Sequence, residues 1–213
     1  MSIIGTVHVD PDSAARVRET ILASRPEVVA LELDEARMIA LLNPKAQRGR
    51  GAGISFLTMA LLERFAGQLA GSAPGTEMLE AARAARQVGS RIEFIDLPIV
   101  NTALALKRLP RREKAKLVID SLASLVVLPF GKINWSEITE DLETQIEGFR
   151  KRYPTLSRLL IDSREEYMIY RLKHILESTN GHVLAVVGFG HRASLARAFA
   201  DYMEAPGHAS GAA

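Results

Sequence analysis

Four short strand-like runs, at residues 3–9, 27–33, 91–97 and 182–188, most constrain what this chain can fold into. The second and fourth runs contain stretches of Val, Ala and Leu without the polar alternation of a strand that is exposed on one face. Strands of this kind are covered on both faces, and the helical segment between the first two runs favours a parallel pair. We therefore predict an α/β fold, in which a small central sheet of about four strands, mostly parallel or mixed, is flanked by helices.

Local signals mark where the intervening helices begin and end. Pro11 suits the first position of a helix, and Arg25-Pro26 is typical of its end. Gly89 is a favourable stop for the helix that precedes the third run. Ser163, with Glu166 three positions later, forms a capping box, which predicts that another helix begins there.

The length of 213 residues suits one domain with an excursion. We predict a single domain over residues 1–204, with a helical excursion at about 98–160, and a disordered tail at 205–213. The excursion contains a basic run at 107–116. A short apolar segment at 117–130 follows it, which we interpret as the face of a homodimer, with a lid over a cleft as the alternative.

Composition excludes several classes of site and partner. The chain has no cysteine, so disulfides, thiolate zinc sites, iron–sulfur clusters and a cysteine nucleophile are excluded. Any metal must therefore be held by nitrogen and oxygen ligands. With 27 basic and 25 acidic residues the net charge is only +2, and 6% of the residues are aromatic, so we expect no nucleic-acid partner.

The sequence contains neither a signal peptide nor an apolar run of the roughly 18 to 20 residues that a membrane helix needs. We therefore expect a soluble, cytoplasmic protein. The basic run is interpreted as a solvated face. A weak contact with a membrane surface or with an acidic partner is the alternative.

A glycine followed three residues later by a histidine occurs where the first and the fourth runs end. The two motifs are Gly5-Thr6-Val7-His8 and Gly188-Phe189-Gly190-His191, the second of which we expect to turn the chain before the last helix. Ligands bind at strand ends in open α/β sheets, and a glycine there allows the backbone to approach closely. Two imidazoles from two strand ends could converge on one ion, or each could be an ordinary hydrogen-bonded loop residue.

Glu32 and Arg164 complete the candidates that the pattern itself indicates. Glu32 ends the second run and is an oxygen ligand of the same ion, a general base, or the ion-pair partner of an arginine. Arg164 would lie in the first turn of its helix, where the helix dipole disfavours a cation. This unfavourable position points to a function, and an ordinary ion pair with Glu165 or Glu166 is the alternative.

Four segments of the chain, at residues 5–9, 25–37, 163–168 and 186–191, together resemble the TraB/PrgY family. That family belongs with the GumN and Tiki proteins and, more distantly, with erythromycin esterase-like and ChaN-like domains. The four motifs occur in the same order over most of the chain. One departure is Glu165, where relatives often have Asn.

The resemblance implies a divalent-metal-dependent hydrolase with a peptide substrate, since Tiki proteins are manganese- or cobalt-dependent proteases. It assigns the metal to His8, His191 and Glu32, with manganese or cobalt as the ion and zinc as the alternative. Glu32 would be a ligand or a general base, and Arg164 would stabilise the developing oxyanion or hold a substrate carboxylate. Arg37 matches a further arginine of the family and is the third catalytic candidate, after Glu32 and Arg164. The competing hypothesis is a non-catalytic module that binds a peptide or ligand in the same cleft.

Overall fold

The computed structural model describes residues 1–6, 11–43, 75–127 and 142–202. The chain forms two compact units. The first comprises Met1–Ile99 and Glu165–Ala213, and the second comprises Val100–Arg164, which overlaps the segment predicted as a helical excursion. The predicted tail at 205–213 lies outside the described residues.

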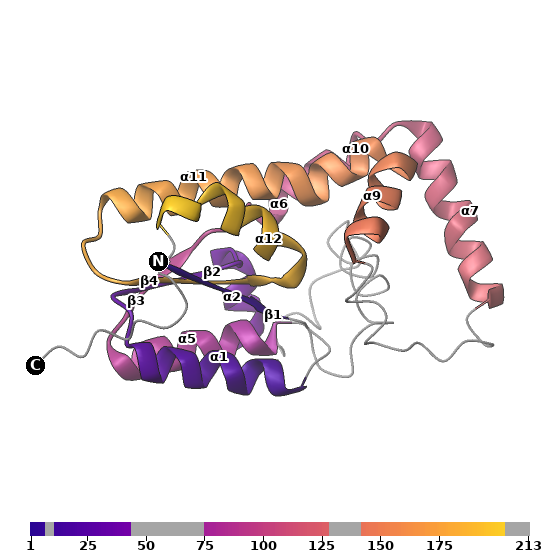
Figure 1. Cartoon of the computed structure of the whole chain (residues 1–213). Coiled ribbons are helices and arrows are strands. Elements are labelled where there is room, and N and C mark those ends of the chain that lie inside the picture. Colours follow the sequence, from indigo (N-terminus) through magenta and orange to yellow (C-terminus); the bar gives the residue numbers. More distant parts are fainter. Residues whose placement is uncertain (7–10, 44–74, 128–141, 203–213) are drawn as a thin grey trace, which may run out of the picture. The chain divides into compact units, whose positions relative to one another are not determined.

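The first unit is built on a four-stranded sheet in which all strands run parallel (Figure 1). Its strands are β1 (Ser2–Thr6), β2 (Val28–Leu31), β3 (Arg91–Phe94) and β4 (Val183–Gly188). The order is β1-β4-β2-β3, so the last strand of the chain lies between the first two. The predicted α/β fold is confirmed, although β2 ends earlier than predicted because the N–H of Leu33 bonds back to the carbonyl of Leu31 at 2.7 Å.

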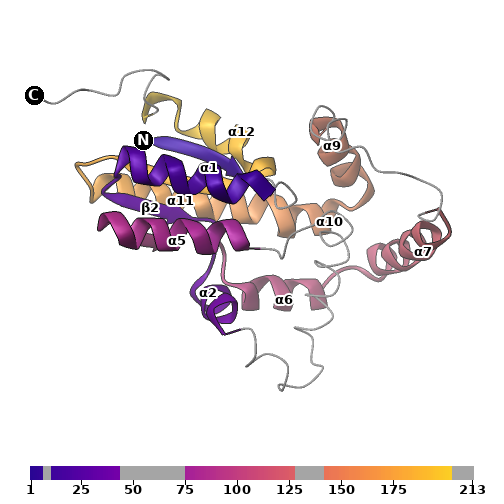
Figure 2. The same cartoon turned by 90° about the horizontal axis from the view of Figure 1, so that it is seen from below.

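Helices cover both faces of this sheet. One face carries α1 (Pro11–Ser24), α2 (Glu35–Leu42) and α5 (Thr76–Val88), and the other carries α11 (Ser163–Glu177) and α12 (Phe189–Ala198). Figure 2 shows α1 and α5 side by side across their face. In β4, Leu184 and Val186 pack in the core with α1 and α5, whereas Val183, Ala185 and Val187 pack in the core with α11 and α12. Successive residues of a strand face opposite sides, so a strand covered on both sides is apolar throughout.

The ends of α1 and α5 lie where the sequence indicated. Arg25 has a positive φ of 42° and is followed by Pro26, so α1 cannot continue beyond Ser24. Gly89 has a φ of 78°, and its N–H bonds to the carbonyl of Arg86 at 3.3 Å. Both predicted stops are confirmed.

The second unit is helical. Its described elements are α6 (Ile99–Lys107), which begins at the boundary, α7 (Arg111–Val127), α9 (Leu142–Arg152), α10 (Pro154–Ser157) and the π-helical turn η2 (Arg158–Asp162). Leu109, Tyr153 and Leu156 form its small core. Residues 128–130 and the side chains of 121–127 are not described, so the dimer face at 117–130 stays a prediction. In the described ranges, no helix is both long and apolar enough to cross a membrane.

Glu113 of α7 fixes the start of α10. Its buried carboxylate accepts hydrogen bonds from the N–H groups of Thr155 and Leu156, both at 3.0 Å. Burial by itself raises the pKa of Glu113, but these bonds, a further bond from the Thr155 side chain and the charge of Lys116 outweigh burial and lower that pKa below 4.5. The carboxylate is therefore charged at neutral pH and ties α7 to α10.

The helix that contains Arg164 does not begin as the capping box predicted. Ser163 has helical angles, φ −64° and ψ −30°, and its N–H bonds to the carbonyl of Arg158 in η2. Since the preceding π-helical turn already supplies an acceptor to this N–H, Ser163 does not start the helix as a cap. The predicted start at Ser163 matches α11, but the predicted capping box is wrong. Because a helical turn precedes Arg164, the argument that the helix dipole disfavours its charge is wrong as well.

Candidate functional site

The C-terminal ends of the strands bring two of the predicted residues to one edge of the sheet. Because all four strands are parallel, the residues that follow them lie along the same edge. Glu32 directly follows β2, and His191 lies just beyond β4. His8 follows β1, whose last residue Thr6 lies opposite Gly188 of β4, but His8 itself lies outside the described residues. Its place at the site stays a prediction.

The Glu32 carboxylate is held against the end of β4. Its Oε2 accepts a hydrogen bond of 2.6 Å from the N–H of Gly188, and the backbone N–H of Glu32 bonds to the carbonyl of Val186 at 2.9 Å. A Cβ atom at position 188 would lie 3.3 Å from Oε2, which is a tight contact. The glycine therefore permits the close approach that its position at a strand end predicted.

His191 lies in the first turn of α12, not in a separate turn before it. Gly188 has extended angles, φ −60° and ψ 146°, and occupies the N-cap position, so α12 begins at Phe189 and the expected turn at 189–191 is wrong. Side chains of a helix lean toward its N-terminus, which directs the His191 ring back toward the end of β4. The residue is buried, and its Nε2 lies 3.6 Å from Oε1 of Glu32.

Glu165 and Ser194, which the sequence did not indicate as site residues, complete the cluster. Oε1 of Glu165 lies 3.0 Å from Nδ1 of His191, and Oε2 accepts a hydrogen bond of 2.8 Å from the Ser194 hydroxyl. His191 thus lies between two carboxylates, one at each ring nitrogen. A signal for Ser194 was present in the sequence, because residues three apart on a helix share a face.

Arg37 lies at the same edge of the sheet and is bound by two aspartates. Its Nε contacts Oδ2 of Asp34 at 2.6 Å, and its Nη2 donates to Oδ2 of Asp96, which follows β3. Asp34 also caps α2 by accepting the backbone N–H of Arg37 at 3.0 Å, and it accepts the N–H of Ile99 at 3.3 Å. The guanidinium group therefore joins the exit of β2 to the exit of β3.

Arg164 belongs to the second unit. Its Nη1 lies 3.4 Å from the carbonyl of Leu160, in η2. Its predicted role beside the metal stays a prediction.

Two donor atoms at the sheet edge suit a divalent cation. When a neutral His191 donates from Nδ1 to Glu165, its Nε2 carries a lone pair that faces Oε1 of Glu32 at 3.6 Å. Two ligands of one tetrahedral ion, each at ~2.1 Å, lie about 3.4 Å apart. A carboxylate behind the other ring nitrogen is typical of metal-binding histidines. Among the described residues no group of three or more His, Asp and Glu is placed to hold a metal, and His8, the third predicted ligand, lies outside them.

The chain is similar to an uncharacterized protein of Methanocaldococcus jannaschii. The two are 28% identical over 209 residues. The matched region covers 92% of this chain and 52% of the relative, so the chain spans about half the length of that protein.

The family comparison covers the sheet and the site together. The model of the TraB/PrgY/gumN family matches residues 1–195. This range includes all four strands, Glu32, Glu165 and His191, as well as the four motifs that carried the resemblance. The chain therefore belongs to the TraB/PrgY/gumN family.

Proposed function

We propose that this chain is a divalent-metal-dependent hydrolase that acts on peptides or on their N-terminal segments. The observation that carries the proposal is the pair of nearly buried side chains of His191 and Glu32 at the C-terminal edge of the sheet, with Glu165 behind the imidazole. The resemblance to the Tiki proteases supports it.

The proposed ion would be held by His191, Glu32 and His8. Manganese or cobalt is the proposed ion, and zinc is the alternative, because nitrogen and oxygen ligands suit all three. A bound divalent ion would supply Lewis acidity and lower the pKa of a bound water toward ~7. Glu32 is either a ligand or the group that accepts the proton of that water.

Glu165 and Ser194 orient His191. The carboxylate of Glu165 holds Nδ1, and the Ser194 hydroxyl in turn holds that carboxylate. The side chains of His191 and Glu32 are only 11% and 9% exposed, so little water screens their charges. Electrostatic interactions are stronger where water is excluded, which favours a cation between two fixed donors.

The two arginines take different parts in this proposal. Arg37 is bound by Asp34 and Asp96, so we assign it a positioning role that holds the strand ends together. Arg164 is proposed to stabilise the developing oxyanion or to hold a substrate carboxylate, since an arginine stays charged and binds oxyanions with two donors.

A non-catalytic module that binds a peptide or another ligand at the same edge is the second candidate. It is favoured by the engagement of Glu32, whose Oε2 is bound to the backbone of Gly188 and whose Oε1 faces His191. A carboxylate fixed in this way can serve as a rigid acceptor for a ligand without turning it over.

Metal content tests the proposal first. The purified protein is loaded with manganese, cobalt or zinc, dialysed and examined by elemental analysis. The wild type should retain about one ion per chain, and both His191→Ala and the double variant His8→Ala/His191→Ala should lose it. His174→Ala is the matched control, because His174 is exposed on α11. This variant should retain the ion. A wild type that stays free of all three metals contradicts the hydrolase.

Peptide cleavage separates the two candidates. The metal-loaded wild type is incubated with a diverse peptide library, and new termini are detected by mass spectrometry. Cleavage that disappears in His191→Ala supports the hydrolase. Retention of peptides without cleavage by a metal-loaded protein supports the binding module instead.

A further inference from the structure

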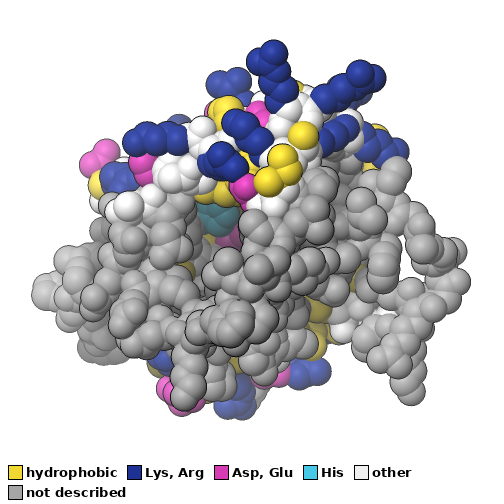
Figure 3. Space-filling model, turned by 90° about the vertical axis from the view of Figure 1, so that its right-hand side faces the viewer, with side chains coloured by type: hydrophobic (Ala, Val, Ile, Leu, Met, Phe, Trp, Pro, Cys, Tyr) yellow, Lys and Arg dark blue, Asp and Glu magenta, His cyan; other side chains and the backbone are white. Residues whose placement is uncertain are grey.

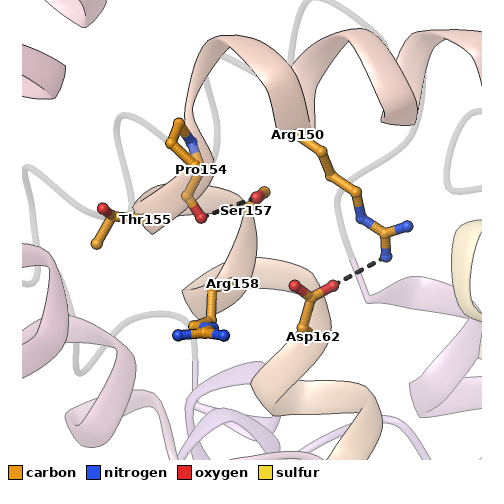
Figure 4. Close-up of a pocket in the computed structure, with 6 residues that line it drawn as sticks. All are labelled: Arg150, Pro154, Thr155, Ser157, Arg158 and Asp162. Atoms are coloured by element: carbon orange, nitrogen blue, oxygen red, sulfur yellow. Dashed lines mark hydrogen bonds and ion pairs between the residues drawn. The ribbon is translucent and has the colours of Figure 1, made fainter.

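A cavity of about 470 Å³ lies wholly within the second unit. It is lined by the end of α9, by α10 and by η2, through Arg150, Pro154, Thr155, Ser157, Arg158 and Asp162 (Figure 4). Its volume falls within the range of roughly 300–1,000 Å³ that is typical of small-ligand sites. The proposed function does not involve it.

Two guanidinium groups are the principal donors on this lining. Nη2 of Arg150 donates to Oδ1 of Asp162 at 2.9 Å, as Figure 4 shows. Nε of Arg150 is buried and has no hydrogen-bond partner within the described part of the chain. Arg158 is exposed, and no ion pair joins it to a described carboxylate. The cavity therefore borders on one arginine that is only partly satisfied and on another that is available to a ligand.

The hydroxyl groups of the lining are directed to the protein. Oγ of Ser157 donates to the carbonyl of Pro154 at 3.1 Å, and the side chain of Thr155 bonds to Glu113. A ligand in this cavity would thus meet mainly cationic donors.

Two described carboxylates of this unit, Asp120 and Glu147, bind side chains that do not line the cavity. Asp120 binds Arg152 and Tyr153, and Glu147 binds Lys151 at 3.4 Å. Figure 3 shows Lys and Arg side chains gathered on the upper part of the face it presents, with few acidic ones among them. The exposed basic residues of this unit outside the cavity include Lys107, Arg108, Arg111, Arg112, Lys114 and Lys116. Such a field raises the local concentration of anions.

We propose that this cavity binds an oxyanion, a carboxylate or a phosphate group, between the guanidinium groups of Arg150 and Arg158. Arginine presents parallel N–H donors in a planar fork that matches both groups. Asp162 holds Arg150 in the wall and also disfavours an anion by its own charge, so the ligand competes with Asp162 for Arg150. The site lies in the second unit and is independent of the proposed hydrolase.

Isothermal titration of the full chain with inorganic phosphate, and separately with succinate, tests this site at constant ionic strength. Arg158→Gln should weaken binding by about tenfold, because one charge-assisted fork is lost. Asp162→Asn should strengthen it, because the competing charge is removed. Arg112→Gln removes the same charge from an exposed position outside the cavity and should change the affinity by less than about twofold.

The pattern across the three variants decides the outcome. If the wild type binds phosphate more tightly than succinate, the ligand is phosphorylated. If it binds succinate more tightly than phosphate, the ligand is a carboxylate. Failure of the wild type to bind either at millimolar concentration overturns the proposal, as does equal weakening by Arg112→Gln and Arg158→Gln. Weaker binding by Asp162→Asn would also overturn it. If the protein pellets with phosphatidylserine vesicles, and Arg112→Gln and Arg158→Gln reduce this pelleting equally, the basic face binds a membrane instead.

Discussion

Replacing Glu165 with Gln tests whether a carboxylate behind His191 prepares that imidazole for a cation. Oε1 of Glu165 lies 3.0 Å from Nδ1 of His191, and Oε2 accepts the Ser194 hydroxyl at 2.8 Å. Glutamine has the same shape but no charge, and only one of its two terminal atoms is an acceptor. It can therefore serve as an acceptor for His191 or for Ser194, but not for both.

The expected loss of metal affinity follows from replacing a charged acceptor by a neutral one. A hydrogen bond to a charged group contributes about 1.5–3 kcal/mol and a neutral one about 0.5–1.5 kcal/mol, so the difference is about 1–1.5 kcal/mol. Removal of the group that orients a metal-binding histidine typically weakens metal affinity by about 10- to 100-fold. Since Gln keeps part of the contact, we expect about a tenfold loss, which corresponds to about 1.4 kcal/mol.

Competition with a chelator measures the manganese affinity of the wild type and the variant. The matched control is Glu166→Gln, which makes the same change at an exposed position beside Glu165 on α11 and should leave the affinity unaltered. ¹⁵N NMR of the His191 ring provides a readout that does not require metal, because loss of the Glu165 charge should redistribute the proton between Nδ1 and Nε2. Unchanged affinity and an unchanged ring spectrum in Glu165→Gln would refute the reasoning, as would an equal loss in Glu166→Gln.

Four other substitutions probe the framework by urea denaturation. Glu113→Gln should lower the free energy of unfolding by about 1.5–3 kcal/mol at pH 7. Because the pKa of Glu113 is lowered in the folded state, its charge stabilises the fold above pH 4.5, and this stabilisation is lost as the pH falls through the folded pKa. The destabilisation by Glu113→Gln should therefore shrink below pH 4.5. A destabilisation that does not change with pH would contradict this reasoning. Gly188→Ala should destabilise by about 1 kcal/mol, whereas Gly148→Ala, where a Cβ meets nothing within 4 Å in a helix, should stabilise by about 0.5–1 kcal/mol. Arg37→Ala should lower the free energy of unfolding by about 3 kcal/mol, because it removes the Arg37 charge from beside Asp96, whose side chain is 1% exposed. A loss under about 1 kcal/mol would contradict the positioning role.

The fold could be predicted because its strands carry a strong local signal. β2 and β4 are apolar at successive positions, and both faces of each are buried in the structure. Continuous burial leaves few alternatives to a sheet between two helical layers. The order of the strands could not be predicted in the same way, because it depends on contacts between segments far apart in the sequence, such as Ser2 opposite Leu184.

The strand-end residues of the site were also accessible to sequence reasoning. Parallel strands end at one edge, so Glu32 and His191 could be assigned to the same place without knowing the order of the strands. Glu165 could not be assigned to the site from the sequence, because its position depends on how α11 packs. Adjacent residues on a helix point about 100° apart, so the choice between residues 164 and 165 requires the helix to be placed correctly. The predicted start at Ser163 matches that of α11, but a start alone does not say which face of the helix packs on the sheet.

The identity of residue 165 bears on the proposed cation site. The resemblance to the TraB/PrgY family implies Asn at this position in many relatives, and an asparagine side chain is shorter and uncharged. Here the residue is Glu, and its carboxylate lies 3.0 Å from the imidazole whose other nitrogen faces Glu32. Two carboxylates around one buried imidazole form an environment that a cation stabilises and a neutral ligand does not. A Glu165→Asn variant should therefore bind a cation beside His191 more weakly than the wild type, because one of the two carboxylates around the imidazole is lost.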